Sequence, residues 1–472
     1  MPQTLFAKIW NEHLVTATDT GGLLLIDRIF LHERTGGVAL QSLAASGRGV
    51  MSPGQVFATM DHVVDTRPGR NDRTQGTFAA PFIEVTRREA QAAGIHLFDI
   101  GDPRQGIVHV ISPELGIVLP GLTLVCPDSH TGTQGALGAL AWGIGSTEAE
   151  HALATQTLRV PKPRTMRVLI DGTLPTDVTA KDLALHLIAT FGAAGGKGFV
   201  VEFAGTAIRD MDLEARMTLC NMATEFSAFA AIIAPDEKTY AYLRGSAFAP
   251  AGERWDRALQ HWQSLYSDAD AAFDSEIRLD AREAQPMVTW GTNPQDAVAI
   301  GATVPAYEVV GERHTRQTYD RALEYMGLES RRPLLGLPID AAFIGACTNS
   351  RLDDLRSAAA VLEGRTVAPG VRAMCVPGST RVKRLAEAEG LHLIFQQAGF
   401  EWRESGCSMC FAAGGESFGP QRRVISSTNR NFEGRQGPGT RTHLASPRTV
   451  AASAIAGCIA DARHLAPRDP PR

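Results

Sequence analysis

The sequence predicts a multidomain α/β protein, and three observations support this fold class. Short apolar runs typical of buried strands alternate with segments whose apolar residues recur every three or four positions, as in helices. Glycine accounts for 46 of the 472 residues, which favours a fold with many tight loops. Hydrophobic residues make up 44% and charged residues 21%, so the chain can bury a large core. At about 100–200 residues per domain, this length predicts roughly two to four domains.

The expected elements follow one another as strand-then-loop units. Strands are expected at residues 56–60, 122–126, 166–171, 199–203, 342–345, 371–376 and 424–427. Helices are expected at 135–145, at 180–191 with Asp177 or Thr179 as the N-cap, at 213–229, and from Leu352 onward. Pro333 and Pro338 indicate a boundary, so we expect α/β subdomains over 1–165, over 166–335 with a helical connector, and over 336–472.

Several expected strands end in loops that are dense in polar side chains. The segments 61–62, 128–130 and 429–430 read Asp-His, Asp-Ser-His and Asn-Arg, and each directly follows an apolar run. In open α/β sheets, ligands bind beyond the carboxyl ends of the strands. These loops therefore predict one composite site rather than scattered surface polarity.

Composition excludes several other classes of protein. The net charge is −5 and there is no long basic run, so we expect no nucleic-acid partner. No apolar stretch approaches the roughly 20 residues that a membrane helix needs, and residues 1–20 do not resemble a signal peptide. We therefore expect a cytoplasmic protein without a membrane partner. Seven cysteines are too few and of the wrong parity for a disulfide framework.

Three of the cysteines form a candidate metal-binding set. Cys407 and Cys410 form a C-x-x-C turn after Gly406, and Cys347 lies after an expected strand and before an expected helix. Helix N-termini stabilise thiolates. Spacing alone leaves several interpretations open: a [4Fe–4S] cluster with one iron that lacks a protein ligand, structural zinc, a thiol-redox pair, or cysteines that only pack. The remaining cysteines have apolar surroundings and are expected to pack: Cys126, Cys220, Cys375 and Cys458.

The local motifs around these residues resemble the aconitase and isopropylmalate isomerase family of iron–sulfur hydro-lyases. The blocks that carry the resemblance are Phe57–His62, Gly106–Val110, Asp128–Thr131, Thr289–Pro294, Phe343–Arg351, Gly406–Cys410 and Asn429–Arg435. The resemblance runs from about Thr4 to Asp461 and is greatest to the isopropylmalate isomerase large subunits of leucine biosynthesis.

The resemblance implies a fold, a reaction and a partner. The fold is three doubly wound α/β/α subdomains around one central [4Fe–4S] cluster, with the swivel domain absent from this chain. The reaction removes water from a small 2-hydroxy dicarboxylic acid and adds it back with hydroxyl and hydrogen exchanged. For isopropylmalate isomerase it interconverts 2- and 3-isopropylmalate through 2-isopropylmaleate. The partner is a separate small subunit that carries the swivel domain and forms a heterodimer with the large one.

The resemblance also implies roles for individual residues. The cluster ligands are Cys347, Cys407 and Cys410, and the supporting amides are Asn349 and Asn429. The groups that handle protons are His130, Asp128, His62, Asp61 and Glu225. The substrate-binding side chains are Arg430, Arg435, Ser129, Asn221 and His32, and Asn221 and Glu225 are expected four apart on one helical face.

Three departures from the leucine-pathway pattern lie beside these residues. Pro127 stands where glycine is usual, Ser405 where proline is usual, and Phe411–Gly415 differs from the usual Leu-Ala-Met-Asn. They leave open a paralogous hydro-lyase for another 2-hydroxy acid, such as 2-methylmalate or a homoaconitate-type substrate. A non-catalytic iron-responsive binding protein is an alternative of another class, and it would be expected to carry a basic surface.

Overall fold

The computed structural model describes residues 1–72 and 79–465. Its residues group into two compact units, each assembled from separate stretches of the chain. The first unit comprises the described residues of Met1–Val63, Phe78–Thr173 and Gly196–Ala281. The second comprises those of Val64–Thr77, Leu174–Gly195 and Arg282–Arg472. Among the described residues, no helix is both long and apolar enough to cross a bilayer.

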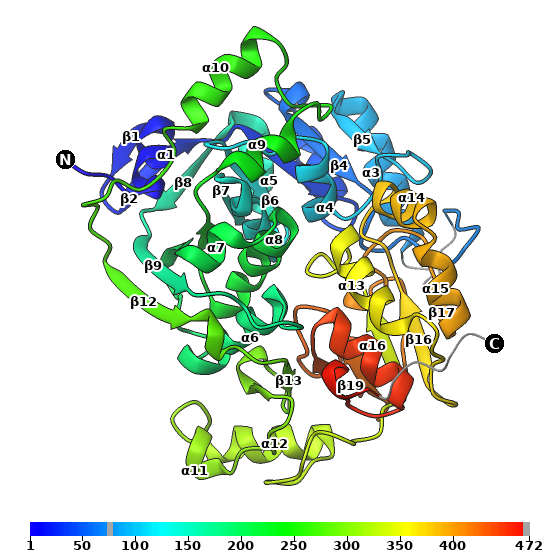
Figure 1. Cartoon of the computed structure of the whole chain (residues 1–472). Helices are drawn as coiled ribbons and strands as arrows, with labels where there is room; N and C mark the ends of the chain where they lie inside the picture. Colours follow the sequence, from blue (N-terminus) through cyan, green and yellow to red (C-terminus); the bar gives the residue numbers. More distant parts are fainter. Residues whose placement is uncertain (73–78, 466–472) are drawn as a thin grey trace. The chain divides into compact units, whose positions relative to one another are not determined.

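Two parallel sheets form the framework of the first unit (Figure 1). One has the order β5-β4-β3-β6-β7, with β3 Arg28–His32, β4 Val56–Thr59, β5 His96–Phe98, β6 Thr123–Cys126 and β7 Leu140–Gly143. The other has the order β11-β10-β9-β12, with β9 Arg164–Asp171, β10 Phe199–Ala204, β11 Ala230–Ile232 and β12 Ser275–Asp280. An antiparallel sheet joins β1 Leu14–Thr18, β2 Gly21–Leu25 and β8 Thr157–Pro161. Every residue of β4 and β6 is buried, as expected of a parallel strand covered on both faces.

The helices of the first unit connect these strands. They are α1 Leu5–His13, α2 Gly36–Ala45, α3 Ala80–Ala93, α4 Val108–Glu114, α5 Ser146–Thr155, α7 Thr206–Asp210, α8 Leu213–Met222, α9 Glu237–Leu243 and α10 Glu253–Trp262. The 3-10 turns are η1 Pro53–Gln55, η2 Ser129–Leu137 and η3 Ala223–Phe226.

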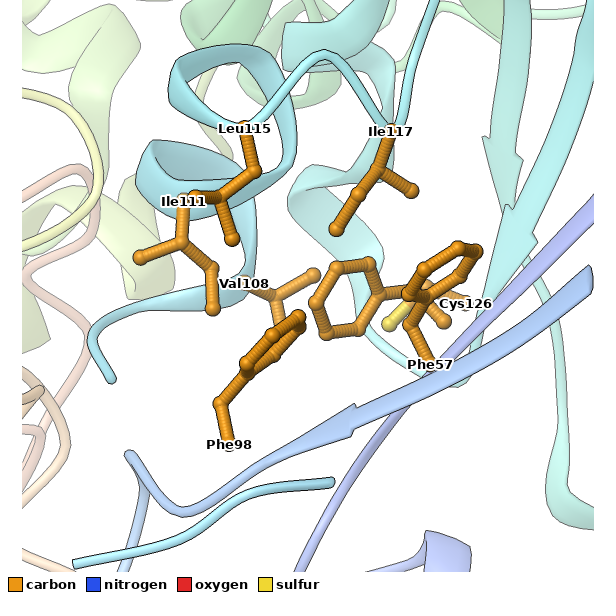
Figure 2. Packing of buried hydrophobic residues seen from close by; sticks show 8 residues of the cluster. Phe57, Phe98, Val108, Ile111, Leu115, Ile117 and Cys126 are labelled. Atoms are coloured by element: carbon orange, nitrogen blue, oxygen red, sulfur yellow. The ribbon is translucent and has the colours of Figure 1, made fainter. Parts of the chain in front are cut away.

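An aromatic cluster fixes α4 against the five-stranded sheet. Figure 2 shows Phe57 and Phe98 from the sheet near Val108 and Ile111 of α4 and Leu115, the residue that follows the helix, all of them buried. Since burying one such side chain contributes about 1.5–3 kcal/mol, this contact holds the start of α4 firmly at the sheet. The same packing fixes the position of His109, the second residue of α4.

A five-stranded parallel sheet forms the framework of the second unit. Its order is β17-β16-β15-β18-β19, with β15 Ala341–Ile344, β16 Arg372–Cys375, β17 Phe400–Trp402, β18 Arg423–Ser426 and β19 Arg441–Leu444. The antiparallel pair is β13 Met287–Thr289 and β14 Ala297–Ala299. The helices are α6 Ala180–Phe191, α11 Tyr307–Val310, α12 Arg316–Met326, α13 Leu352–Leu362, α14 Thr380–Ala388, α15 Leu391–Ala398 and α16 Pro447–Ala456. The 3-10 turns are η4 Ala281–Glu283, η5 Pro294–Asp296, η6 Ser408–Cys410 and η7 Ala462–His464.

The α/β class with parallel sheets is confirmed, and most of the expected strands lie within one or two residues of their predicted positions. Helix α6 begins after Thr179, whose hydroxyl accepts a hydrogen bond from the Asp182 backbone. The three parallel sheets lie within residues 28–143, 164–280 and 341–444. The division into three subdomains stays a prediction, since the contacts define two units.

Two helix predictions were wrong in extent. Residues 135–145 do not form a helix, because Gly138 adopts a left-handed conformation that ends η2 and Leu140–Gly143 then pair with β6. Gly135 has a packing role instead, since a Cβ atom there would lie 1.7 Å from the Ala231 carbonyl oxygen. Residues 213–229 form a helix only to Met222, followed by the single turn η3, which ends at the left-handed Ser227.

Candidate active site

His62 of the first unit lies between two carboxylates at the carboxyl edge of the parallel sheet. Its Nδ1 atom is 2.6 Å from Oδ1 of Asp61, and its Nε2 atom is 3.0 Å from Oδ2 of Asp128. Burial opposes ionisation of Asp61, but the charge and hydrogen bond of His62 lower its pKa below the usual range. With both carboxylates ionised, both ring nitrogens must donate, so His62 is held as an imidazolium.

Asp128 connects three neighbours. Its Oδ1 atom accepts a hydrogen bond from Nε2 of His109 at 2.9 Å and from the backbone N–H of His130 at 2.7 Å. Although burial opposes ionisation, His109 and His62 hold the pKa of Asp128 well below its usual range. The Nδ1 atom of His109 lies 3.5 Å from the Gln134 amide nitrogen, so His109 fits the tautomer with its proton on Nε2.

His130 shares a hydrogen bond with Glu225. The His130 Nε2 and Glu225 Oε1 atoms are 2.7 Å apart, and the two side chains are only 5% and 8% exposed. At this separation one proton must lie between the two groups, so the pair can hold and release a proton at one point. Asn221 lies in the last turn of α8 and donates to the Thr133 hydroxyl at 2.9 Å. Asn221 and Glu225 are therefore in different turns, the α-helix and η3, rather than on one regular helix face.

His32 and Glu33 support the Asp61-His62 turn. The His32 ring stacks on His62 with 3.9 Å between centroids, and burial lowers the pKa of His32 to about 4. The Glu33 carboxylate accepts the backbone N–H groups of Asp61 and Val63 at 3.0 and 2.6 Å, and burial with the neighbouring Asp61 charge raises its pKa to about 7. These contacts join His32, Glu33, Asp61 and His62 into one compact group.

In the second unit, the three candidate cysteine ligands follow strands of one parallel sheet. Cys347 comes after β15, and Cys407 and Cys410 come after β17. Met409 lies between the latter two and is fully buried in the core with Phe343 and other side chains, which anchors their turn. The three cysteines are 5–7% exposed, and all seven cysteines are free thiols.

The Asn429 amide connects two of these sulfurs. Its Nδ2 atom donates to Sγ of Cys347 at 3.4 Å, and its Oδ1 atom accepts from Sγ of Cys410 at 3.9 Å. Asn429 lies in the loop after β18. The buried Lys181 stabilises this loop by donating hydrogen bonds to the backbone carbonyls of Ser427 and Thr428. Asn429 thus sets the separation between the two cysteine loops.

The spacing of the sulfurs tests what they could hold. A tetrahedral zinc ion with Zn–S bonds of about 2.3 Å would place its sulfur ligands about 3.8 Å apart. Among the described residues, the only His, Cys, Asp and Glu side chains with three or more ligand atoms mutually within 4.8 Å are His32, Glu33, Asp61 and His62. The sulfurs of Cys347, Cys407 and Cys410 are outside that set, so they do not all lie within 4.8 Å of one another.

Arg435 lies next to Cys410 and places a positive charge beside the three cysteines. Its guanidinium lies 4.7 Å from the Phe411 ring centroid and 5.4 Å from that of Phe432. One of its nitrogens, Nη2, is 3.6 Å from Sγ of Cys410. Gln436 secures the same loop by donating to the Met409 carbonyl at 3.1 Å.

The remaining predicted residues lie in the same two regions. Ser129 is exposed beside His130, with its hydroxyl 3.4 Å from Nδ1 of that ring. Arg430 is half-buried next to Asn429. The Asn349 amide donates to Asp354 at 2.8 Å, which ties the Cys347 loop to the start of α13. Every role assigned to these side chains stays a prediction.

Known proteins match the chain over almost its full length. The family model for aconitase (aconitate hydratase) matches residues 7–457. The chain belongs to the aconitase family. The 3-isopropylmalate dehydratase large subunit 1 of Bradyrhizobium diazoefficiens is 52% identical to it over 464 residues, which is 98% of this chain and 97% of that protein. Members of the aconitase family typically bind a [4Fe–4S] cluster, and this chain offers three buried free thiols, those of Cys347, Cys407 and Cys410, as candidate ligands.

The structure adds residues that sequence reasoning missed. His109 contacts Asp128 but was not proposed for the site, although its segment, Gly106–Val110, resembles the family. Glu33 and Lys181 carry no local motif and act by holding backbone groups of the site loops. The family-like block Gly106–Val110 could have pointed to His109, and the polar loop after β3 could have pointed to Glu33, whereas Lys181 lies on α6 with no such signal.

Proposed function

We propose that the chain is the large subunit of a 3-isopropylmalate dehydratase, which isomerises 2- and 3-isopropylmalate in leucine biosynthesis. The observation that carries this proposal is the 52% identity to a subunit of that name over nearly the whole of both chains. The cysteine set and the histidine–carboxylate network support the same hydro-lyase chemistry.

The reaction balances as one elimination followed by one addition. From 2-isopropylmalate, the C2–O bond and a C3–H bond break, which gives 2-isopropylmaleate and water. Water then adds in the opposite sense, with hydroxyl to C3 and hydrogen to C2. The enzyme must protonate the leaving hydroxyl, remove a carbon-bound proton and hold two carboxylates.

The proposed cofactor is one [4Fe–4S] cluster held by Cys347, Cys407 and Cys410, with one iron that has no protein ligand. When bound, the cluster supplies a Lewis-acidic iron that polarises the substrate oxygens. Asn429 holds the two cysteine loops at their separation, and Asn349 fixes the loop of Cys347. Three doubly wound subdomains around this cluster remain part of the proposal.

His130 and Glu225 form the proposed acid for the leaving hydroxyl. The proton between His130 Nε2 and Glu225 Oε1 is available on elimination, and the pair can take a proton back from water on rehydration. Asp128 orients His130 through its backbone N–H, while Asp61 and His62 fix Asp128. This network keeps the acid pair in one orientation.

Substrate carboxylates are proposed to bind Arg430 and Arg435, whose planar guanidinium groups match carboxylates in two-point hydrogen bonds. Ser129, Asn221 and His32 are the further proposed substrate-binding residues. The base for the carbon-bound proton is proposed to lie on a separate small subunit, which would form a heterodimer with this chain. The relative's name, a large subunit, supports such a partner.

A second candidate is a paralogous hydro-lyase for another 2-hydroxy acid. Pro127 and Phe411 favour it, because they depart from the leucine-pathway pattern and lie beside proposed site residues. The Pro127 carbonyl oxygen accepts a hydrogen bond from Nε2 of His32 at 3.1 Å, and the Phe411 ring makes a cation–π contact with Arg435. A different hydroxy acid would be distinguished by its side chain alone.

The experiment is a substrate comparison with a reconstituted pair of subunits. The chain is loaded with iron and sulfide without oxygen and mixed with a small subunit of the leucine pathway. We expect turnover of 2-isopropylmalate that needs both chains, with a kcat/KM at least about tenfold above that for 2-methylmalate or homoaconitate. Preference for another acid would favour the paralogue, and turnover by the large chain alone would contradict the proposed partner.

A further inference from the structure

We propose that residues 64–70, here called the strap, form a clamp that holds the Cys407–Cys410 turn closed, with Thr66 and Arg70 as positioning residues. All of these residues belong to the second unit. The role toward a cluster rests on the proposed function, but the clamp itself is a property of the chain.

The strap bonds to the cysteine turn on both sides of Cys407. Before Cys407, the Thr66 carbonyl oxygen accepts the Glu404 backbone N–H at 2.6 Å, and the Arg70 guanidinium donates to the carbonyl of Ser405. After Cys407, the Thr66 hydroxyl donates to the Ser408 hydroxyl at 2.9 Å. A ligand residue bracketed in this way cannot shift unless the strap shifts with it.

Ser408 needs such a restraint. Its φ of +47° lies in the left-handed region, which costs a non-glycine residue about 1–2 kcal/mol. Contacts with the surrounding residues must therefore stabilise this conformation of Ser408, and the hydrogen bond from Thr66 is one of these contacts. Without it, Ser408 can relax toward ordinary backbone angles and carry Cys407 and Cys410 with it.

Ser405 supplies the partner for Arg70 on the other side. Its side chain is fully buried, and its Oγ atom lies 3.5 Å from Nη2 of Arg70 and 3.1 Å from the Thr380 hydroxyl. The leucine-pathway pattern usually has proline at this position, which offers no hydroxyl. The serine thus gives this chain an extra attachment point for the strap.

A small hollow lies beside the Cys407–Cys410 turn, where reagents could approach the sulfurs if the strap moved. It is lined by Val64, Asp65 and Thr66 of the strap and by Ser408, Gly414 and Glu416. Because Cys407 and Cys410 are only 7% and 5% exposed, we infer that the strap limits the access of reagents and oxidants to these sulfurs.

The test measures the reactivity of each cysteine in the full-length chain without metal. The reduced protein is treated with iodoacetamide, and alkylation of each cysteine is followed over time by mass spectrometry of peptides. Arg70→Ala and Thr66→Val should raise the rates at Cys407 and Cys410 about fivefold, as expected for the loss of one buried hydrogen bond. Arg70→Lys, which retains a positively charged donor group, should restore part of the protection.

Arg67→Ala is the matched control. Arg67 lies in the same strap, but its side chain is 52% exposed and its ion pair is with Asp65 of the strap itself. We expect wild-type rates in this variant. The fully buried Cys126, Cys220 and Cys375 should stay protected in every variant, which separates local opening from unfolding.

Unchanged rates at Cys407 and Cys410 in both Arg70→Ala and Thr66→Val would overturn the clamp, and so would an equal rise at all seven cysteines. A second readout is iron release in air from the reconstituted chain, which should be about fivefold faster for Arg70→Ala. Failure of the wild type to bind iron would contradict the proposed function, whereas the labelling result would still decide the clamp.

Discussion

The Nε2 atom of His130 lies 2.7 Å from the Oε1 atom of Glu225, and both side chains are almost completely buried. A histidine in this position can neither reorient nor exchange its proton freely with solvent. The pair therefore works as one proton-holding group, and its removal should affect the chemical step more than substrate binding.

Glu225→Gln tests this relationship. The amide keeps the shape of the side chain but cannot share a proton with His130, so kcat should fall about 10²- to 10⁴-fold with little change in KM. Steady-state kinetics of the reconstituted two-subunit enzyme give both constants. Glu237→Gln, at an exposed position on α9, is the control and should behave as wild type. A loss confined to KM would show that Glu225 binds substrate instead.

Asp128→Asn tests the centre of the network. The amide oxygen can still accept the hydrogen bonds from His109 and the His130 N–H, but the amide nitrogen then faces Nε2 of His62. The His62 imidazolium would lose this carboxylate partner, so the free energy of unfolding should drop by about 3 kcal/mol. Activity should fall at least about 10²-fold, because a neutral amide no longer holds His62 and the His130 backbone with a negative charge. Urea unfolding measures the change in stability, and steady-state kinetics of the reconstituted enzyme measure the change in activity. Wild-type stability would mean that Asp128 is not the connecting group described here.

The free energy of unfolding should depend on pH through the protonation of His443. This residue accepts a hydrogen bond from Arg423 at 2.8 Å, and burial together with the Arg423 charge lowers its pKa to about 3. Between pH 6.5 and 3 the unfolded chain binds a proton on this histidine that the folded chain does not, so stability is lost as the pH falls.

His443→Gln should remove that loss. The urea-unfolding free energy of the metal-free wild type should decrease more steeply between pH 6.5 and 4.5, by up to about 1.4 kcal/mol per pH unit, than that of the variant. His151→Gln, at an exposed position on α5, should keep the wild-type slope. Equal slopes for His443→Gln and wild type would contradict the buried neutral histidine.

Phe411→Leu tests how Arg435 is oriented. Loss of the nearer cation–π contact should raise KM about two- to fivefold, the effect of about 0.5–1 kcal/mol, while kcat changes less than about twofold. Phe432→Leu removes the more distant ring, which is 47% exposed, and should have a smaller effect. A change in kcat alone would indicate that Phe411 supports the cysteine turn rather than substrate binding.

The strand ends of the site could be predicted from the sequence because their apolar runs are short and end in dense polar segments. Asp61, Asp128 and Asn429 all follow strands as expected. His109 could not be found in this way, since it lies on α4 and meets Asp128 only through the packing of that helix on the sheet.

Other features depend on three-dimensional packing that no local pattern encodes. The segment 135–145 has helix-like composition, but Gly138 and the pairing of Leu140–Gly143 with β6 make its second half a strand. The i/i+4 spacing of Asn221 and Glu225 suggested one helix face, whereas a change of helix type at Ala223 separates them. The link between cysteine loops through Asn429 follows from the adjacency of β15 and β18 in the sheet.

The most direct test of the central claim is the metal content of the chain after anaerobic reconstitution with iron and sulfide. We predict about four iron atoms per chain with a broad visible thiolate-to-iron absorbance. Cys347→Ser should lose both, and Cys458→Ser, outside the proposed ligand set, should retain both. One zinc ion per chain in place of iron, or a full iron complement in Cys347→Ser, would contradict the account.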